Sequence, residues 1–348
     1  MNRRDLLTGA AKLGTALSLS ATPFISPRRA QAATTISFVS WGGSYGDFVK
    51  EFWIKPFTAE TGISVEYING PDLAKVKAQV ESNNVLWDVF DTPGTQAYAA
   101  AKQGLWEAID TKIVDSERFV HKPPPFAIPT AIYTGGIAYD PARTKHAAND
   151  FSQLWDVKSF PGRRALHGAN GTAETLTVAL LADGVAPNEL YPLDVDRAFK
   201  ALERIKPYVK KWFGETAQGV SLIQTNEVDY TITYANRVRS AREAGISIDF
   251  SFGQNINVVQ YFTVLKGSPR KEASMRFLDF ISRPAQQALI GNQLGVVPVT
   301  KGAEQSIDER ARRWLPNLSN PKNVFLSNEY WADNFVDLDK RFKEWILT

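Results

Sequence analysis

The part of the chain after position 33 alternates between short apolar strand patterns and helix patterns, and this alternation limits the possible folds more than any other feature. Strand patterns occur at 35–41, 63–67 and 86–90, and helix patterns at 48–53, 73–80 and 96–103. Strands that alternate with helices form parallel sheets with right-handed crossovers. An α/β fold is therefore expected.

A second group of elements follows a proline-rich passage at 123–129. Strands are expected at 133–139, 164–167, 229–234 and 258–265. Helices are expected at 151–156, 173–182, 195–209, 237–244, 271–282 and 285–292. The chain is thus long enough, and contains enough elements, for about two domains with separate cores.

The first 32 residues have the features of an export signal. Arg3 and Arg4 precede a mildly apolar stretch, and Ala30-Gln31-Ala32 forms a cleavage site. The paired arginines resemble a twin-arginine signal, although an ordinary secretory signal remains open. Polar residues and glycines interrupt the run of about 20 apolar residues that a membrane-spanning helix needs. We therefore expect cleavage near Ala32 and a mature protein in the periplasm that does not span the membrane.

Composition excludes several functions. Of the 40 basic and 37 acidic residues, five basic residues and one acidic residue lie in the signal, so the mature chain has 35 and 36. This near-neutral balance gives no electrostatic reason to expect nucleic acid or anionic membranes as partners. The chain has no cysteine, which excludes disulfides, thiolate metal sites and a lipid-anchoring cysteine.

Six short motifs lie between positions 36 and 303. They are Gly42-Gly43, the segment from Pro56 to Ile63, Trp87-Asp88-Val89, the segment from Leu154 to Gly162, the segment from Ala273 to Phe280, and Gly295-Val296-Val297-Pro298. Their order and spacing resemble the family 1 extracellular solute-binding proteins of ABC transporters. Within that family the chain is similar to the spermidine/putrescine-binding group.

The resemblance implies a two-lobed periplasmic binding protein of type II. Each lobe would be a mixed, mostly parallel sheet flanked by helices, and crossing strands near 133–139 and 250–259 would join the lobes. Residues 33–134 and 256–303 would form lobe 1, residues 139–252 lobe 2, and the helical segment 304–348 would pack across both. A monomer that closes on a small molecule and delivers it to an inner-membrane ABC permease is expected, with no cofactor and no enzymatic activity.

Candidate ligand-binding residues in the first lobe follow the ends of strands, where ligands of open α/β sheets bind. They are Trp41, Gly42, Gly43, Ser44, Tyr45, Thr92, Pro93 and, at a presumed crossing strand, Tyr133. Glycines let backbone N–H groups approach a ligand, and aromatic rings offer walls for a cation or an alkyl chain. Core packing, a plain turn and hinge packing remain the alternatives for these residues.

The second half of the chain contributes further candidate ligand-binding residues, chosen by comparison with relatives or for the chemistry of their side chains. They are Asn170, Thr172, Glu174, Tyr234, Arg237 and Tyr261. The resemblance matches Glu174 to a carboxylate of polyamine-binding relatives, but the second acidic position falls on Asn170 or Gly171. The relatives' acid near Tyr261 is also missing. Arg237 would repel a polyamine and favour a carboxylate. A small amine is therefore expected, either a polyamine or, as a better fit to these charges, a zwitterion such as 4-aminobutyrate with its ammonium on Glu174 and its carboxylate on Arg237. A simple first-turn helix acid and a solvent-facing helix arginine remain the alternatives for these two residues.

The sequence leaves three other functions to consider. Trp41, Tyr45, Tyr133 and Tyr234 could form an aromatic cage for thiamine or another aromatic cation. A ferric-iron site is less favoured, because the chain lacks adjacent tyrosines and its three histidines lack metal-site spacing. Gly42-Gly43-Ser44-Tyr45-Gly46 matches a serine-hydrolase elbow, but it follows the first strand rather than a later one. Hydrolysis is therefore improbable.

Overall fold

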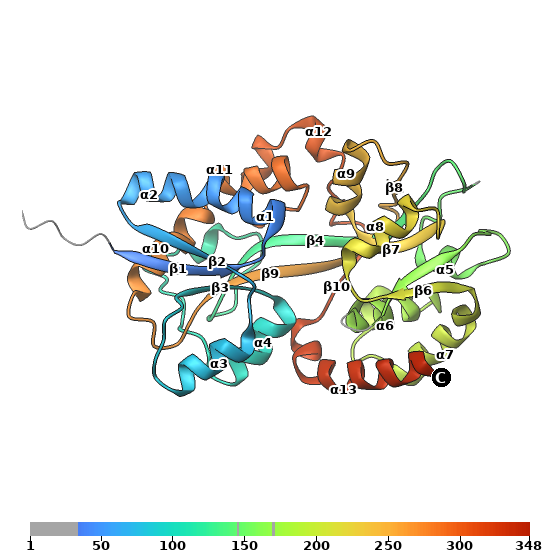
Figure 1. The fold of residues 1–348 in the computed structure, drawn as a ribbon, viewed down its shortest axis with the longest axis horizontal. Helices are drawn as coiled ribbons and strands as arrows, with labels where there is room; N and C mark the ends of the chain where they lie inside the picture. Colours follow the sequence, from blue (N-terminus) through green and yellow to red (C-terminus); the bar gives the residue numbers. More distant parts are fainter. Residues whose placement is uncertain (1–33, 145, 169–170) are drawn as a thin grey trace, which may run out of the picture. The chain divides into compact units, whose positions relative to one another are not determined.

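The computed structural model describes residues 34–144, 146–168 and 171–348. The expected export signal, 1–32, and Asn170 lie outside the described residues. The strands are β1 (Thr35–Ser40), β2 (Ser64–Asn69), β3 (Val89–Pro93), β4 (Ile128–Tyr139), β5 (Arg164–His167), β6 (Val209–Phe213), β7 (Tyr230–Tyr234), β8 (Asp249–Phe250), β9 (Ile256–Val264) and β10 (Val324–Phe325). They form one continuous sheet (Figure 1).

The sheet contains two parallel groups of strands on either side of an antiparallel pair. Its order is β2-β1-β3-β9-β4-β7-β5-β6, with β8 beside β4 and β10 beside β9. β1 runs parallel to β2 and β3, and β5 runs parallel to β6 and β7. β9 and β4 are antiparallel to each other and to their neighbours β3 and β7. The predicted α/β fold, with two parallel groups joined by two long strands, is confirmed.

The two central strands lie close together along most of their length (Figure 1). Their register runs from Ile128 opposite Phe262 to Gly135 opposite Ile256. A Cβ atom at Gly135 would lie 2.9 Å from the Ile256 side chain. At Gly136, a Cβ atom would lie 2.6 Å from the Asn255 side chain. These two glycines therefore permit the close approach of the chains around the central pair.

The α-helices are α1 (Gly43–Phe48), α2 (Lys55–Thr61), α3 (Leu73–Glu81), α4 (Gly94–Lys102), α5 (Phe151–Trp155), α6 (Thr172–Ala182), α7 (Val195–Ile205), α8 (Thr216–Gln224), α9 (Ala235–Glu243), α10 (Lys271–Ile281), α11 (Pro284–Leu289), α12 (Glu309–Arg312) and α13 (Asn328–Leu347). Single π-helical segments, Val49–Ile54 and Ile290–Leu294, extend α1 and α11. Short 3₁₀ turns occupy Ser116–Arg118, Pro187–Glu189, Lys206–Tyr208 and Ala303–Ser306.

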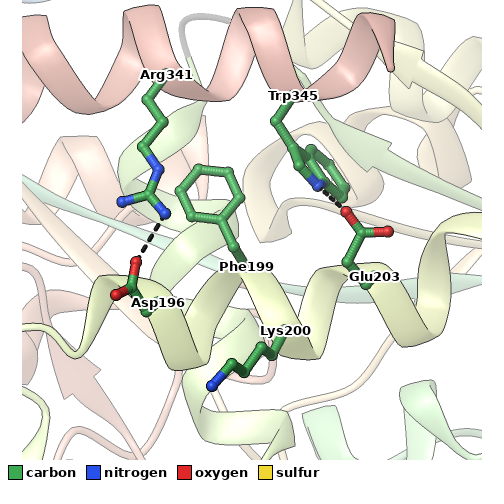
Figure 2. A pocket seen from close by; sticks show the side chains of 6 residues that line it. All are labelled: Asp196, Phe199, Lys200, Glu203, Arg341 and Trp345. Atoms are coloured by element: carbon green, nitrogen blue, oxygen red, sulfur yellow. Dashed lines mark hydrogen bonds and ion pairs between the residues drawn. The ribbon is translucent and has the colours of Figure 1, made fainter.

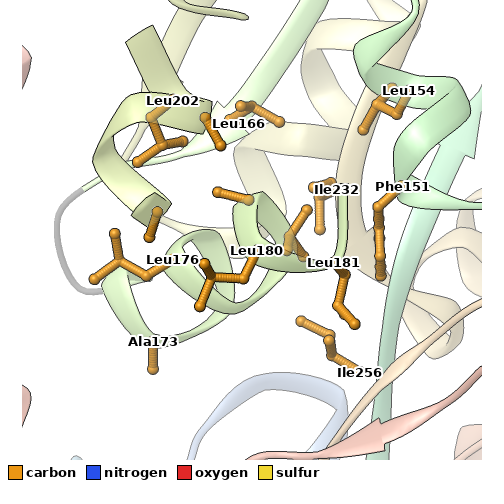
Figure 3. Packing of buried hydrophobic residues seen from close by; sticks show 14 of the residues in the cluster. Phe151, Leu154, Leu166, Ala173, Leu176, Leu180, Leu181, Leu202, Ile232 and Ile256 are labelled. Carbon is orange, nitrogen blue, oxygen red and sulfur yellow. The ribbon is translucent and has the colours of Figure 1, made fainter. Parts of the chain in front are cut away.

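Each parallel group has its own core. On the β1 side, aromatic rings dominate, with Phe38 packed between Phe262 and Phe277 at centroid distances of 4.7 and 5.4 Å. On the β5 side, the apolar helix α6 is buried on nearly all sides. Its Leu176 and Leu180 belong to a cluster with side chains of α5, β5, α7 and β7 (Figure 3). The two cores hold the strand ends of both groups in place.

The C-terminal helix α13 contacts elements from both groups, including α4 and α6. Lys102 of α4 forms an ion pair with Asp333, while Thr172 of α6 donates a hydrogen bond of 2.6 Å to Asp339. At its end, Arg341 and Trp345 lie over α7, where Arg341 bonds Asp196 at 2.7 Å (Figure 2). Side chains of α7 and α13 line a surface hollow of about 300 Å³ there.

Two expected elements were placed wrongly. The helix predicted to reach Val209 ends at Ile205, because Pro207 cannot donate a backbone hydrogen bond, and residues 209–213 form β6 instead. The strand predicted at 86–90 lies at Val89–Pro93. The first residues of the predicted strand do not join the sheet, since the backbone N–H groups of Leu86 and Trp87 both donate to the Gln79 side chain at 2.9 Å.

Candidate functional site

The loop after β1 lies at the carboxyl end of that strand, beside the carboxyl end of the parallel strand β3. Gly43 has a φ of +67°, a conformation that glycine adopts without strain. A Cβ atom at Gly42 would lie 2.7 Å from the Asn69 side chain. Trp41 is 43% exposed and Ser44 is exposed. The sequence therefore produces an open glycine turn flanked by an exposed indole ring.

Asp91, in the middle of β3, is fully buried. Its carboxylate accepts hydrogen bonds from the Ser40 hydroxyl at 2.6 Å and from the Gln260 amide at 2.5 Å. The side chains of Tyr45 and Trp41 also favour its charged form. Burial raises the pKa of Asp91 to about 7, although these hydrogen bonds to the charged form oppose the shift.

Tyrosines extend from Asp91 along the sheet. Burial raises the pKa of Tyr45, and the charges of Asp91 and the nearby Tyr133 and Tyr67 raise it further. The Tyr67 hydroxyl donates to the carbonyl oxygen of Trp41. Burial also raises the pKa of Tyr133 on β4, and the charge of Asp91 raises it further. The hydroxyl groups of both Tyr45 and Tyr133 therefore stay protonated at neutral pH and can donate hydrogen bonds to a ligand.

The tyrosine series continues across the sheet to β7. Tyr133 and Tyr234 meet edge to face, with ring centroids 6.1 Å apart. The Tyr234 hydroxyl donates a hydrogen bond of 2.8 Å to Glu174 at the start of α6. Burial and the Glu174 charge raise the pKa of Tyr234, whereas the charge of Arg237 opposes this shift. The charge of Arg237, an exposed residue of α9, also opposes the rise in the pKa of Tyr133.

These residues form one group, the charged aromatic cluster, which we define as Tyr45, Asp91, Tyr133, Glu174, Tyr234 and Arg237. It joins the carboxyl ends of β3 and β7 with the starts of α1, α6 and α9. Protonated tyrosine hydroxyls, two carboxylates and a guanidinium can together bind a small ligand that carries both an ammonium and a carboxylate group.

Other sequence candidates lie outside the cluster, and three of them make contacts elsewhere. Thr92 is buried, and its hydroxyl makes only 3.4 Å contacts to Pro93 and Gln96. Thr172 is engaged by Asp339 of α13. Tyr261 packs with Tyr98 at a centroid distance of 6.1 Å.

Strand geometry explains the position of Tyr261. Successive side chains of a strand point to opposite faces, and its neighbour Gln260 is the residue that binds Asp91. Pro93 is opposite Gln260 in the β3–β9 register.

Sequence reasoning missed Asp91. Its position in the segment Asp91-Thr92-Pro93-Gly94 is typical of a turn, where acidic residues are common. The structure instead makes Asp91 a central residue of β3, with Phe262 opposite it on β9. An acid that directly extends the apolar run of a buried strand was the available signal.

Other features of the described residues bear on the alternatives. Within the described ranges, no group of three or more histidine, aspartate or glutamate side chains is arranged to hold a metal ion. His167 lies 3.2 Å from the carbonyl oxygen of Gly214. A second surface hollow, of about 490 Å³, lies between the end of α9 and Trp314, away from the cluster. None of the helices in the described ranges has the length and apolar character required to cross a bilayer.

The fold and the cluster together define a two-lobed ligand-binding protein. A family model for the bacterial extracellular solute-binding proteins matches residues 53–313, and the chain belongs to this family. The family resemblance inferred from the sequence is thereby confirmed.

Three similar proteins were compared with the chain. The gamma-aminobutyric acid-binding protein of Pseudomonas aeruginosa is 30% identical over 345 residues, which cover 94% of this chain and 95% of that protein. A solved receptor for gamma-aminobutyric acid (GABA) is 31% identical with a TM-score of 0.83, covering 90% and 98% of the two chains. A solved ABC transporter substrate-binding protein from Bradyrhizobium japonicum is 33% identical with a TM-score of 0.84, covering 90% and 99%.

Proposed function

We propose that the mature chain is the periplasmic substrate-binding component of an ABC importer and that it captures a small amine-containing solute, with 4-aminobutyrate (GABA) or a similar zwitterion preferred. The observation that carries this proposal is the charged aromatic cluster. It groups the Arg237 guanidinium and the carboxylates of Asp91 and Glu174 with the same tyrosines. The similarity to two GABA-binding proteins supports the same ligand class.

Arg237 is the residue that favours a zwitterion over a polyamine. A guanidinium binds a carboxylate with charge-assisted hydrogen bonds, whereas it repels an ammonium group. Among the described residues Arg237 has no ion-pair partner within 4 Å, so its charge is available to a ligand. The Glu174 carboxylate, held by Tyr234, provides a partner for the ligand's ammonium group.

Lobe closure is part of this proposal. β4 and β9 lie between the two parallel groups and would act as the hinge, with the lobes divided at 33–134 plus 256–303 and 139–252. The closed lobes would then present one surface to a permease in the inner membrane. Export by the N-terminal signal would place the protein in the periplasm.

Binding of an aromatic cation such as thiamine is the second candidate. The exposed Trp41 ring and the tyrosines of the cluster offer faces for a cation. Catalysis is not proposed, because Ser44 lies exposed on the short helix α1 and no histidine of the described residues forms a hydrogen bond with it. The arrangement thus favours binding without a chemical step.

A thermal-shift screen of residues 33–348 tests the ligand class. GABA, other amino acids, putrescine, thiamine and ferric salts would each be added at increasing concentration. A ligand at a hundred times its Kd adds about 2.7 kcal/mol to the free energy of unfolding. We expect GABA or a close zwitterion to raise the melting temperature. A shift with thiamine alone would favour the second candidate instead.

Two variants test the charge assignment. Arg237→Ala and Glu174→Ala should each weaken GABA binding by about tenfold or more, because each removes a charge-assisted hydrogen bond. Arg242→Ala, which removes a neighbouring arginine on α9 paired with Asp249, is a matched control. If both site variants kept the affinity of the unmodified protein, the charge assignment would be wrong.

A further inference from the structure

Asp91 is a buried carboxylate without a positive partner. It is fully buried, and within the described ranges no lysine, arginine or histidine nitrogen lies within ion-pair distance of it. Its carboxylate oxygens accept hydrogen bonds from the neutral Ser40 and Gln260 side chains. A buried charge that lacks a counter-ion is costly, and such a group favours its neutral form. This cost would be relieved by a cation that bound beside it.

The position of Asp91 in the sheet adds a second observation. β3 lies on one side of the central β9–β4 pair, whereas β7 and the following helix α9 lie on the other. Tyr133, on the central strand β4, is influenced by both Asp91 and Arg237. The negative and the positive charge are therefore held by opposite halves of the sheet, with the same tyrosine near both.

We propose that Asp91 provides a second anionic partner for the ligand's ammonium group, on the opposite side of the β9–β4 pair from Arg237, and that binding of the ligand removes the proton from Asp91. This inference rests on the proposed function. Glu174 and Arg237 belong to the same half of the sheet, so those two alone would hold a zwitterion without connecting the halves. Asp91 makes the ligand contact both halves.

Contact with both halves is what allows a ligand to drive closure. A ligand shifts a conformational equilibrium only as far as it binds one state better than the other. An ammonium group has three N–H donors, so it can bond to both Glu174 and Asp91 when the halves approach. The proton that leaves the Asp91 carboxyl group passes to the solvent, and the N–H···O bond from the ligand takes its place.

Proton release by Asp91 can be recognised only if no other group near it titrates in the same pH range. The titratable and charged groups that face it, or face the tyrosines next to it, are Tyr45, Tyr67, Tyr133, Asp47, Lys50, Glu174 and Arg237. The pKa values of the three tyrosines are raised above 10, so these hydroxyls do not titrate near neutral pH. Burial raises the pKa of Asp91 to about 7, which is where a proton would be released.

Calorimetric titration with GABA tests this inference. At pH 7, in two buffers of different ionisation enthalpy, the unmodified protein should release about half a proton per ligand, since Asp91 is about half protonated there. Its affinity should rise about tenfold between pH 6 and pH 8, because only the charged carboxylate binds the ammonium group. The charges of GABA itself do not change in this range.

Variants separate Asp91 from its neighbours. Asp91→Asn should bind GABA at least about tenfold more weakly at pH 8 and release no proton. Glu174→Gln should still release the proton. Asp333→Asn, which removes an exposed carboxylate on α13, is the matched control and should behave as the unmodified protein. Butyrate, which lacks the ammonium group, should bind without proton release.

Three outcomes would overturn the inference. Unchanged affinity and proton release in Asp91→Asn would show that Asp91 does not contact the ligand electrostatically. A pH-independent affinity of the unmodified protein would do so without any variant, even if Asp91→Asn failed to fold. If the unmodified protein bound no amine at all, the proposed function itself would fail and the role of Asp91 would fail with it.

Discussion

At the residue scale, the site depends on polar side chains that are buried, as at Asp91, or half-buried, as at Glu174. Asp91 is bonded to Ser40 and Gln260, and Glu174 is bonded to Tyr234. These hydrogen bonds fix the acceptors before a ligand arrives. Pre-ordering of this kind raises affinity because less conformational freedom is lost on binding.

Asp91 should also make the stability of the ligand-free protein depend on pH. Its pKa is about 7 in the folded chain against an ordinary value of 3.8. Between about pH 4 and pH 7 the unfolded chain has released the proton while the folded chain still holds it, so the free energy of unfolding falls as pH rises. The slope from this group is at most roughly 1.4 kcal/mol per pH unit, and the loss is complete above about pH 7.

Urea unfolding between pH 4.5 and pH 8 measures this dependence. Asp91→Asn removes the titrating group, so its free energy of unfolding relative to the unmodified protein should rise with pH up to about pH 7 and then stay level. A difference that stayed constant between pH 4.5 and pH 8 would mean that Asp91 is charged throughout in the folded protein. Asp333→Asn again provides the exposed control.

At the scale of elements, α6 is the helix whose packing positions the second half of the site. Glu174 lies in its first turn, and the following residues are buried on almost every side. Leu180 is 1% exposed and packs in the cluster shown in Figure 3. Loss of this packing would move the carboxylate as well as destabilise the fold.

Leu180→Ala should lower the free energy of unfolding by about 2–5 kcal/mol, because it removes a buried side chain and leaves a cavity. Val336→Ala on α13 is a matched control, since Val336 is 79% exposed and its truncation should change the stability by less than about 0.5 kcal/mol. Urea denaturation gives both values. Equal effects of the two changes would contradict the burial of α6.

Elements with strong local signals were predictable from the sequence. β5 was predicted at 164–167 and is found at Arg164–His167, in a short segment bounded by Gly162 and Gly168. β6 was not predicted, because the helical pattern of apolar residues continues to Val209 although the α-helix ends before Pro207.

The tyrosines and charges of the cluster were largely anticipated from strand ends and family motifs. Asp91 was not, because its burial depends on β9, which lies far away in the sequence and pairs with β3.

At the scale of the whole molecule, residues 34–348 combine two parallel strand groups, a shared antiparallel pair and a helix that contacts both sides. Trp331 of α13 is fully buried, and its indole donates a hydrogen bond of 3.0 Å to Tyr191. The helix also reaches α4, through the ion pair of Asp333 with Lys102. Any closing motion about β4 and β9 therefore has to be accommodated by α13.

In the proposed complex, one small zwitterion is held between the two halves of the sheet by charges from both. A crystal structure of residues 33–348 grown with GABA tests it most directly. We expect the ligand carboxylate at Arg237, the ammonium group between Glu174 and Asp91, and the carbon chain against Tyr133 and Tyr234. Ligand bound in either surface hollow, or held by residues of one half alone, would contradict the claim.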